Sequence, residues 1–112
     1  MAVEVDWRGE LSVPSDLEPL AQSVLAEALR NITKHASPAH VSVLVARDNE
    51  RFTLKVRNDG VPNRPRAQTG SGMGLRLAAF EALQYGGVVE SGPAQDGCWE
   101  VRLVVRLGQE TA

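Results

Sequence analysis

A run of glycines opens the segment that we predict to be the second helix of the chain. In "GSGMGLR", Gly70, Gly72 and Gly74 occupy every second position. Glycine costs up to about 1 kcal/mol relative to alanine inside an element, so its repeated use indicates that something approaches the backbone closely. Backbone N–H groups and the positive end of a helix dipole suit an anion, which makes phosphate the obvious candidate. A flexible hinge before the helix is the alternative interpretation.

Two familiar phosphate-binding motifs do not fit this run. The dinucleotide fingerprint needs G-x-G-x-x-G directly after a strand, whereas a long polar loop precedes the glycines here. The Walker-type loop needs Lys-Ser or Lys-Thr after its last glycine, whereas Leu75 and Arg76 follow Gly74. The glycines therefore indicate an anion site of another kind.

A second set of polar residues lies in "EALRNITKHA", within the predicted first helix. Glu27, Asn31 and Lys34 are four and three residues apart, so they share one stripe of that helix. Carboxylate and amide oxygens suit Mg²⁺, and the lysine offers a point charge to a phosphate. Glu27 is also able to accept a proton from a nucleophile. The alternative is an ordinary solvated helix face stabilised by spaced charges.

The hydrophobic pattern predicts the elements that position these residues. The first helix begins near "PSDLEPL", where Ser15 and Glu18 have capping-box spacing, and ends before Pro38. The second runs from about Gly72 to Tyr85 and stops at two glycines. The polar, proline-containing segment 58–69 is predicted to be a functional or mobile loop. Alternating apolar residues predict strands at 3–7, 40–46, 52–56, 88–90 and 99–107.

This order of elements predicts the fold class. Helices do not separate every pair of strands, which favours an α+β fold over a doubly wound parallel sheet. We expect a two-layer sandwich, with the helices on one face of a mixed, mostly antiparallel sheet. The 112 residues fit one domain, 1–112.

Composition excludes several classes of partner. The net charge of −2 argues against a nucleic-acid surface, which needs a basic excess on one face. Cys98 is the only cysteine, so the chain builds neither a disulfide framework nor a cysteine metal cluster. The apolar runs are strand-sized, so we expect no direct membrane contact. A cytoplasmic domain is expected, either free or as the cytosolic part of a membrane-bound sensor.

The motifs resemble a known family when they are taken in chain order. "EALRNITKHA", "VRNDG", the proline-containing loop and "GSGMGL" resemble the ATP-binding catalytic domain of sensor histidine kinases. This domain belongs to the superfamily shared with gyrase, Hsp90 and MutL. The resemblance runs from roughly Val3 to Leu107 and includes the short lid of NarL/DesK-like kinases. It implies the Bergerat-type ATP-binding fold, with ATP and Mg²⁺ as cofactors.

The resemblance also implies a role for each motif. "EALRNITKHA" is similar to the N box, in which Glu27 acts as base or water-positioner and contributes to the metal site. Asn31 holds Mg²⁺, Lys34 touches the phosphates, and His35 lies beside the adenine.

The two glycine-containing motifs complete the implied site. "VRNDG" is similar to the first glycine box, and the residues at about 59–71 form the ATP lid. Arg64 and Arg66 in that lid either reach the phosphates or keep a loop soluble. The implied nucleotide contacts of these two boxes and the lid are Asn58, Asp59, Gly60, Arg64, Gly70, Ser71, Gly72, Met73, Gly74 and Leu75.

Some positions depart from the family pattern. Asn58 stands where the family has the aspartate that accepts the adenine amino group, and Pro62 replaces the second glycine of that box. Cys98 and Trp99 stand where the family often has a Gly-Thr pair. These changes concern the adenine pocket rather than the phosphate end.

The resemblance implies a protein-histidine kinase domain in two-component signalling. Such a domain transfers the γ-phosphoryl group of ATP to a histidine on a separate dimerisation domain, and a response regulator acts downstream in the phosphorelay. Neither His35 nor His40 lies in an acceptor-type segment. Two alternatives remain at this point: an anti-sigma-factor serine kinase, and a non-catalytic interaction module with a degenerate nucleotide site.

Overall fold

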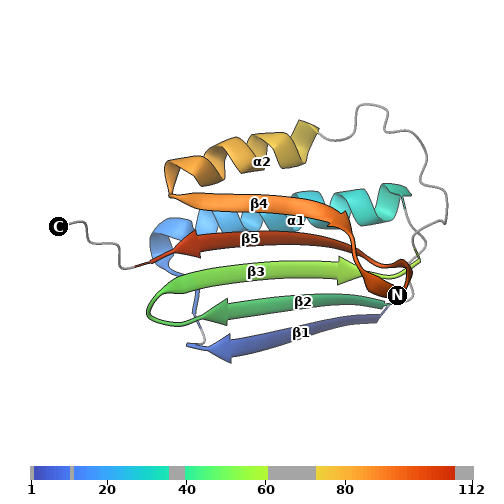
Figure 1. The fold of residues 1–112 in the computed structure, drawn as a ribbon, viewed down its shortest axis with the longest axis horizontal. Coiled ribbons are helices and arrows are strands. Elements are labelled where there is room, and N and C mark those ends of the chain that lie inside the picture. The colour runs from blue at the N-terminus through green and yellow to red at the C-terminus, as the bar shows by residue number, and fades with distance from the viewer. Residues whose placement is uncertain (1, 11, 36–39, 61–72, 108–112) are drawn as a thin grey trace.

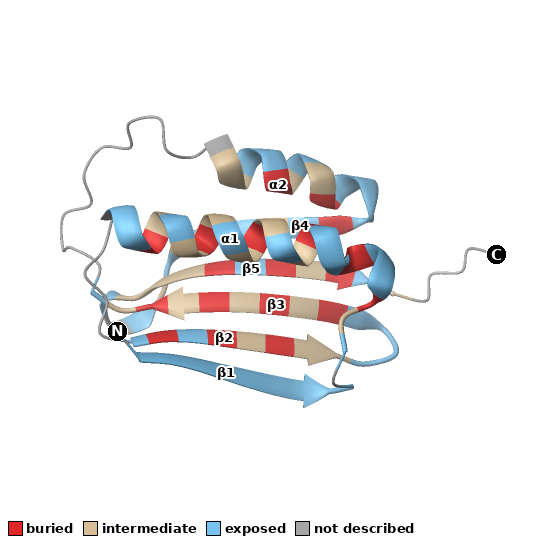
Figure 2. Cartoon of the chain, turned by 180° about the vertical axis from the view of Figure 1, so that it is seen from behind, coloured by how far each residue is buried: buried red, intermediate tan, exposed pale blue. Residues whose placement is uncertain are grey.

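The chain folds into one five-stranded sheet with two helices on one of its faces (Figure 1). The computed structural model describes residues 2–10, 12–35, 40–60 and 73–107. The strands form one layer and the helices the other, which Figure 2 shows from the helix side. The predicted α+β two-layer sandwich with a mixed, mostly antiparallel sheet is therefore confirmed.

The sheet has the spatial order β1-β2-β3-β5-β4. Only β1 and β2 pair in parallel, and the other three neighbouring pairs are antiparallel. Among the described residues, β1 and β4 are therefore the edge strands. The strands are β1 Ala2–Gly9, β2 His40–Arg47, β3 Arg51–Asn58, β4 Gly87–Pro93 and β5 Trp99–Arg106.

A tight turn sets the register of the β2–β3 hairpin. The carboxylate of Asp48 accepts the backbone N–H groups of Glu50 at 2.7 Å and Arg51 at 3.0 Å. These hydrogen bonds hold the pKa of Asp48 below its ordinary value, because they stabilise the charged form. At the other end of the hairpin this register pairs Asn58 with Val41.

The inward face of the sheet is apolar because successive strand residues point to opposite faces. Phe52, Leu54 and Val56 of β3 are all buried, and each is paired with a buried apolar residue of β5. Burial of an apolar side chain of this size contributes about 1.5–3 kcal/mol to stability. The buried partners on β5 are Val105, Leu103 and Val101.

The helices bury one stripe each against this face. α1 Glu18–His35 lies on β3 and β5, and α2 Met73–Gln84 lies on β4 (Figure 2). The buried stripe of α1 recurs every four residues, as an amphipathic helix requires, and consists of Leu20, Val24, Ala28 and Ile32. Ala21, Leu25 and Leu29 flank this stripe and are only partly buried.

The predicted capping box at the start of α1 is wrong. Ser15 lies inside a short 3-10 turn, Ser15–Leu17, that precedes the helix, and α1 begins only at Glu18. The residue at the N-cap of this turn is Pro14, whose side chain has no hydrogen-bonding group to cap it.

The bounds of three strands also differ from the predicted ones. The strands β1 and β4 extend further than the sequence pattern predicted. Asn58 ends β3 instead of opening the loop.

Candidate functional site

Helix α1 carries three polar residues of the predicted site. Glu27 and Asn31 are partly buried, whereas Lys34 is exposed near the end of the helix. Glu27 and Asn31 lie beside the buried stripe of α1. Each of them comes three residues after one core residue of the stripe and one residue before the next. The predicted common stripe on one helix is therefore present, and it borders the core rather than open solvent alone.

Glu27 lies directly against the start of α2. A β-carbon built on Gly74 would lie 2.0 Å from Oε1 of Glu27 and 2.2 Å from its Cδ, so any side chain at this position would overlap the carboxylate. A side chain at 74 therefore fits only if the carboxylate of Glu27 moves away from its present position. The contact joins the two motifs that the sequence singled out, which are far apart along the chain.

The carboxylate of Glu27 also forms an ion pair with Arg30, one turn along α1. The Glu27 side chain is 23% exposed and that of Arg30 is 54% exposed, so the pair sits at the border between the core and solvent. Sequence reasoning did not assign a role to Arg30. The i, i+3 spacing of "EALR" is the signal that could have found it.

Asn58 is the only buried polar residue among the described parts of the chain. It is 3% exposed, and it continues the inward-pointing series of β3 at the end of the strand. Its amide nitrogen donates a hydrogen bond of 2.9 Å to the backbone oxygen of Asp59. That bond uses the NH₂ end of the amide, which leaves Oδ1 as the end suited to accept a hydrogen bond from a ligand.

Asp59 has a different environment from its neighbour. Its carboxylate accepts the backbone N–H of His40 at 3.0 Å and lies 3.2 Å from the Nδ1 atom of the same residue. Its own N–H donates to the backbone oxygen of His40 at 3.2 Å. Asp59 therefore closes the open end of the β2–β3 hairpin. The sequence did not indicate this contact, because it follows from the strand register.

Trp99 stands opposite Asn58 in the register of β3 and β5. It is partly buried and packs against the core, at the same end of the sheet as Asn58. Cys98 precedes it and is also partly buried. The two positions that depart from the family pattern near the C-terminus are thus adjacent to the buried amide.

The other predicted site residues fall into two groups. Leu75 of α2 packs against the core. Gly60 follows β3 with a φ of 77°, in the left-handed region that favours glycine. His35 is the last residue of α1, and Met73 is the first residue of α2. The predicted contacts Arg64, Gly70, Ser71 and Gly72, and most of the lid at 59–71, lie outside the described residues.

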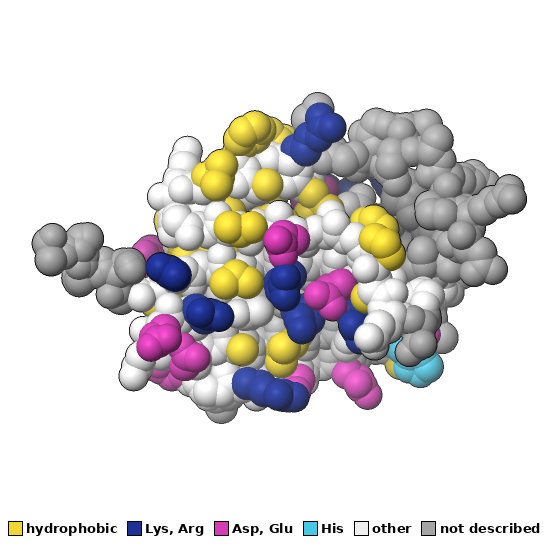
Figure 3. All heavy atoms as spheres, in the orientation of Figure 1, with side chains coloured by type: hydrophobic (Ala, Val, Ile, Leu, Met, Phe, Trp, Pro, Cys, Tyr) yellow, Lys and Arg dark blue, Asp and Glu magenta, His cyan; other side chains and the backbone are white. Residues whose placement is uncertain are grey.

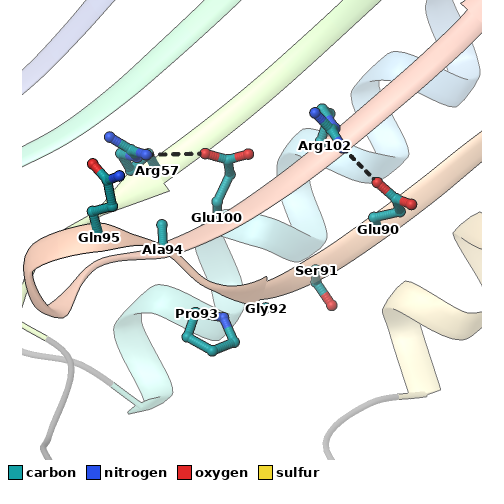
Figure 4. A pocket seen from close by; sticks show the side chains of 9 residues that line it. All are labelled: Arg57, Glu90, Ser91, Gly92, Pro93, Ala94, Gln95, Glu100 and Arg102. Atoms are coloured by element: carbon teal, nitrogen blue, oxygen red, sulfur yellow. Dashed lines mark hydrogen bonds and ion pairs between the residues drawn. The ribbon is translucent and has the colours of Figure 1, made fainter.

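A hollow of about 400 Å³ lies on the opposite face of the sheet, at the β4–β5 hairpin (Figure 4). Its charged side chains form two ion pairs, Arg57 with Glu100 at 3.4 Å and Arg102 with Glu90 at 2.6 Å. The hydrogen bond that Arg102 donates to the carboxylate of Glu90 raises the pKa of Arg102, because it stabilises the charged guanidinium. The hollow faces away from the helices and belongs to a surface where acidic and basic side chains alternate (Figure 3). It does not include the predicted site residues.

The described residues contain neither a cluster of metal-binding side chains nor a membrane-spanning helix. Within ranges 2–10, 12–35, 40–60 and 73–107, no three His, Cys, Asp or Glu side chains converge into a metal-binding cluster. Neither of the helices that the structure describes has the length and apolar character needed to cross a bilayer.

Comparison with known proteins gives no match at the level of sequence families. No protein-family model and no curated protein matches this chain. Solved structures do match. The histidine kinase domain from the Erythrobacter litoralis EL346 blue-light activated histidine kinase aligns with a TM-score of 0.62 and 18% identity, covering 96% of this chain and 56% of that one.

Two more solved structures agree. The Acinetobacter baumannii histidine kinase AdeS has a TM-score of 0.70 and 13% identity, covering 96% of this chain and 55% of its own. The Erythrobacter litoralis EL346 blue-light activated histidine kinase has a TM-score of 0.66 and 17% identity, covering 97% and 39%. The chain spans about half of these proteins or less. It has the fold of a histidine kinase catalytic domain.

Proposed function

We propose that this chain binds ATP with Mg²⁺ and transfers the γ-phosphoryl group to a histidine on a separate dimerisation domain. The observation that carries the proposal is the contact between Glu27 and Gly74. It brings Glu27 of the α1 motif against Gly74, the last glycine of the run and the one that the structure describes. The fold shared with histidine kinase domains supports the same assignment.

The α1 residues fit the metal and phosphate end of the proposed site. Mg²⁺ usually takes one or two protein oxygens and completes its shell with water and substrate phosphates, so one amide and one carboxylate suffice. Because Glu27 is already paired with Arg30, Asn31 is the principal protein ligand in our proposal. When bound, Mg²⁺ neutralises charge on the phosphates. Lys34 adds a positive charge nearby.

The proposed reaction needs a base for the acceptor. The lone pair of the acceptor imidazole forms a bond to the γ-phosphorus, and the bond from that phosphorus to the bridging oxygen breaks, so that ADP leaves with the electron pair. Glu27 accepts the proton that the imidazole ring releases. Most of the catalysis comes from positioning and charge stabilisation, because this transfer requires little other chemistry from the protein.

The function is tested by incubating the chain with labelled ATP and a supplied dimerisation domain. We expect acid-labile label on a histidine of that domain and no label on the chain alone. Acid-stable label on a serine of an added protein substrate would instead support a serine kinase. If the chain failed to bind ATP at all, the proposal would be wrong and an interaction module would remain.

Asn31→Ala is expected to remove most of the dependence of ATP binding on Mg²⁺. We expect micromolar ATP affinity for the unmodified chain, which is about −8 kcal/mol at a Kd of 1 μM. Titration calorimetry with and without Mg²⁺ measures the difference. Gln22→Ala, an exposed position on the same helix, is the matched control and should keep the full metal effect. Equal metal dependence in the two variants would contradict the assignment of Asn31.

Asn58→Ala is expected to weaken ATP binding by about fivefold to tenfold, because a neutral hydrogen bond contributes about 1 kcal/mol. The binding of inorganic triphosphate, which has no base, should be unchanged. Asp59→Ala is the comparison, since its carboxylate is engaged with His40. Both affinities are measured on variants whose thermal unfolding shows that they are folded. A larger loss of ATP affinity in Asp59→Ala would move the base contact to Asp59.

A further inference from the structure

The edge strand β1 is open along its whole length. All eight of its residues are exposed, and among the described strands it pairs only with β2. An edge strand presents a row of unpaired backbone N–H and C=O groups, which is a template for pairing with another strand. Proteins commonly protect such edges with proline, bulges, short strands or a covering helix.

The opposite edge strand, β4, ends in a proline and has a helix packed against it, and β1 has neither feature. β4 carries Pro93 at its end and Gly87 and Gly92 within it, and α2 packs against it. β1 contains no proline, and it runs in regular register with β2 from Ala2 to Gly9. The two edges of one sheet therefore differ, and β1 is the one suited to strand addition.

The helix side of β1 is apolar and uncovered. Val3, Val5 and Trp7 are paired with buried valines of β2 and so lie on the same face of the sheet as the core. They are nevertheless 51%, 57% and 41% exposed. The reason is that α1 lies on β3 and β5 and α2 lies on β4, so neither helix reaches the lower strand in Figure 2.

The outer side of β1 has alternating charges. Glu4, Asp6 and Arg8 point away from the helices, and the guanidinium of Arg8 is bound to the carboxylate of Asp6 at 3.1 Å. When two copies of a strand pair antiparallel around a central residue, the residue two positions before the centre faces the residue two positions after it on the other copy. If one of these residues is acidic and the other basic, the two strands are complementary in charge. Asp6 is that central residue, with Glu4 before it and Arg8 after it.

We propose that β1 pairs antiparallel with β1 of a second copy of this chain, around a two-fold axis at Asp6. In this register Glu4 lies opposite Arg8 of the partner subunit, and Val5 lies opposite Trp7 of the partner subunit. Opposite charges and aromatic with β-branched side chains are favourable cross-strand pairs. The isologous contact occurs twice, as a two-fold axis requires. The result is one sheet continuous across two copies.

The neighbouring registers are less favourable. An axis at Val5 places Glu4 opposite Asp6 of the partner subunit, which is two contacts between like charges. An axis at Trp7 places Asp6 opposite Arg8 of the partner subunit, but it also places Glu4 opposite Glu10 of the partner subunit and leaves Val5 opposite a glycine. The axis at Asp6 has one contact between like charges, and each Asp6 in it is already bound to Arg8 of its own strand.

Sedimentation equilibrium tests the association. We expect the average mass of the chain to rise with concentration toward that of two copies, since a strand-edge contact is a small interface and therefore weak. Val5→Lys should weaken this association about tenfold or more. Val88→Lys is the matched control, because Val88 is 53% exposed on the other edge strand and should leave it unchanged. A constant mass of one chain, or equal effects of both variants, would overturn the proposal.

Cross-linking tests the register. In a Cys98→Ser background, a single cysteine is introduced as Val5→Cys, Asp6→Cys or Trp7→Cys and oxidised. Residues on a two-fold axis face their own copy, so we expect a disulfide-linked dimer mainly from Asp6→Cys. Preferential cross-linking of Val5→Cys or Trp7→Cys would contradict this register. Nucleotide binding plays no part in either measurement, so their outcome is independent of the proposed kinase function.

Discussion

Glu27→Gln is expected to slow phosphoryl transfer to a supplied acceptor about a hundredfold, the lower end of the contribution of a positioned base. Glutamine keeps the size of the side chain and a hydrogen-bond acceptor but does not take up the proton. ATP affinity should change little, because the metal contact in our proposal is made mainly through Asn31. Single-turnover transfer and nucleotide titration measure the two quantities separately.

The ion pair with Arg30 provides a control for this experiment. Arg30→Gln removes the partner of Glu27 but leaves the carboxylate in place, so transfer should persist. Glu50→Gln changes an exposed glutamate in the turn between β2 and β3 and should have no effect. If Glu27→Gln lowered ATP affinity and transfer by the same factor, Glu27 would have a structural role and not a catalytic one.

Gly74→Ala is expected to displace the carboxylate of Glu27, to reduce transfer to a similar extent as the loss of Glu27, and to lack the stabilisation that alanine ordinarily brings to a helix. Alanine is ordinarily favoured over glycine in a helix by up to about 1 kcal/mol. Here the new methyl group would lie 2.0 Å from Oε1 of Glu27, so the carboxylate or the start of α2 must move. The displaced carboxylate loses part of its ion pair with Arg30, and this loss offsets the gain in stability that helix propensity alone would give.

A double variant distinguishes this steric explanation from others. In a Glu27→Ala background the carboxylate is absent, so Gly74→Ala should become stabilising, as helix propensity predicts. Gly92→Ala is the matched control, because no atom lies within 4 Å of a β-carbon built there. Chemical denaturation of the four proteins completes the cycle. Additive effects of the two substitutions would show that Glu27 and Gly74 are not in contact in solution.

Local patterns in the sequence determined the elements and the class of the fold. The alternation at 40–46, 52–56 and 99–107 predicts strands, and the structure has strands there. The helical spacing of Val24, Ala28 and Ile32 corresponds to a buried face of α1. These patterns are reliable because each depends on a repeat within a single element. The motif at Glu27 and the glycine run were also visible, since both are sets of neighbouring residues. The start of α1 could not be predicted from the sequence. Ser15 lies in a 3-10 turn, and the residue types around it do not distinguish such a turn from a helix cap.

Only the tertiary structure decided how these parts meet. The burial of Asn58 depends on the register of β3 with β2 and β5. Asp59 differs from it because Asp59 follows the end of β3 and its carboxylate contacts His40. The contact of Glu27 with Gly74 depends on how α1 packs beside α2, which no local pattern reports. The exposure of β1 was also decided by the tertiary structure. The sequence indicated the apolar residues of this strand, but they are exposed because the two helices cover other strands of the sheet. Contacts between residues distant along the chain are set by the packing of whole elements, and that information is not contained in the period of any one of them.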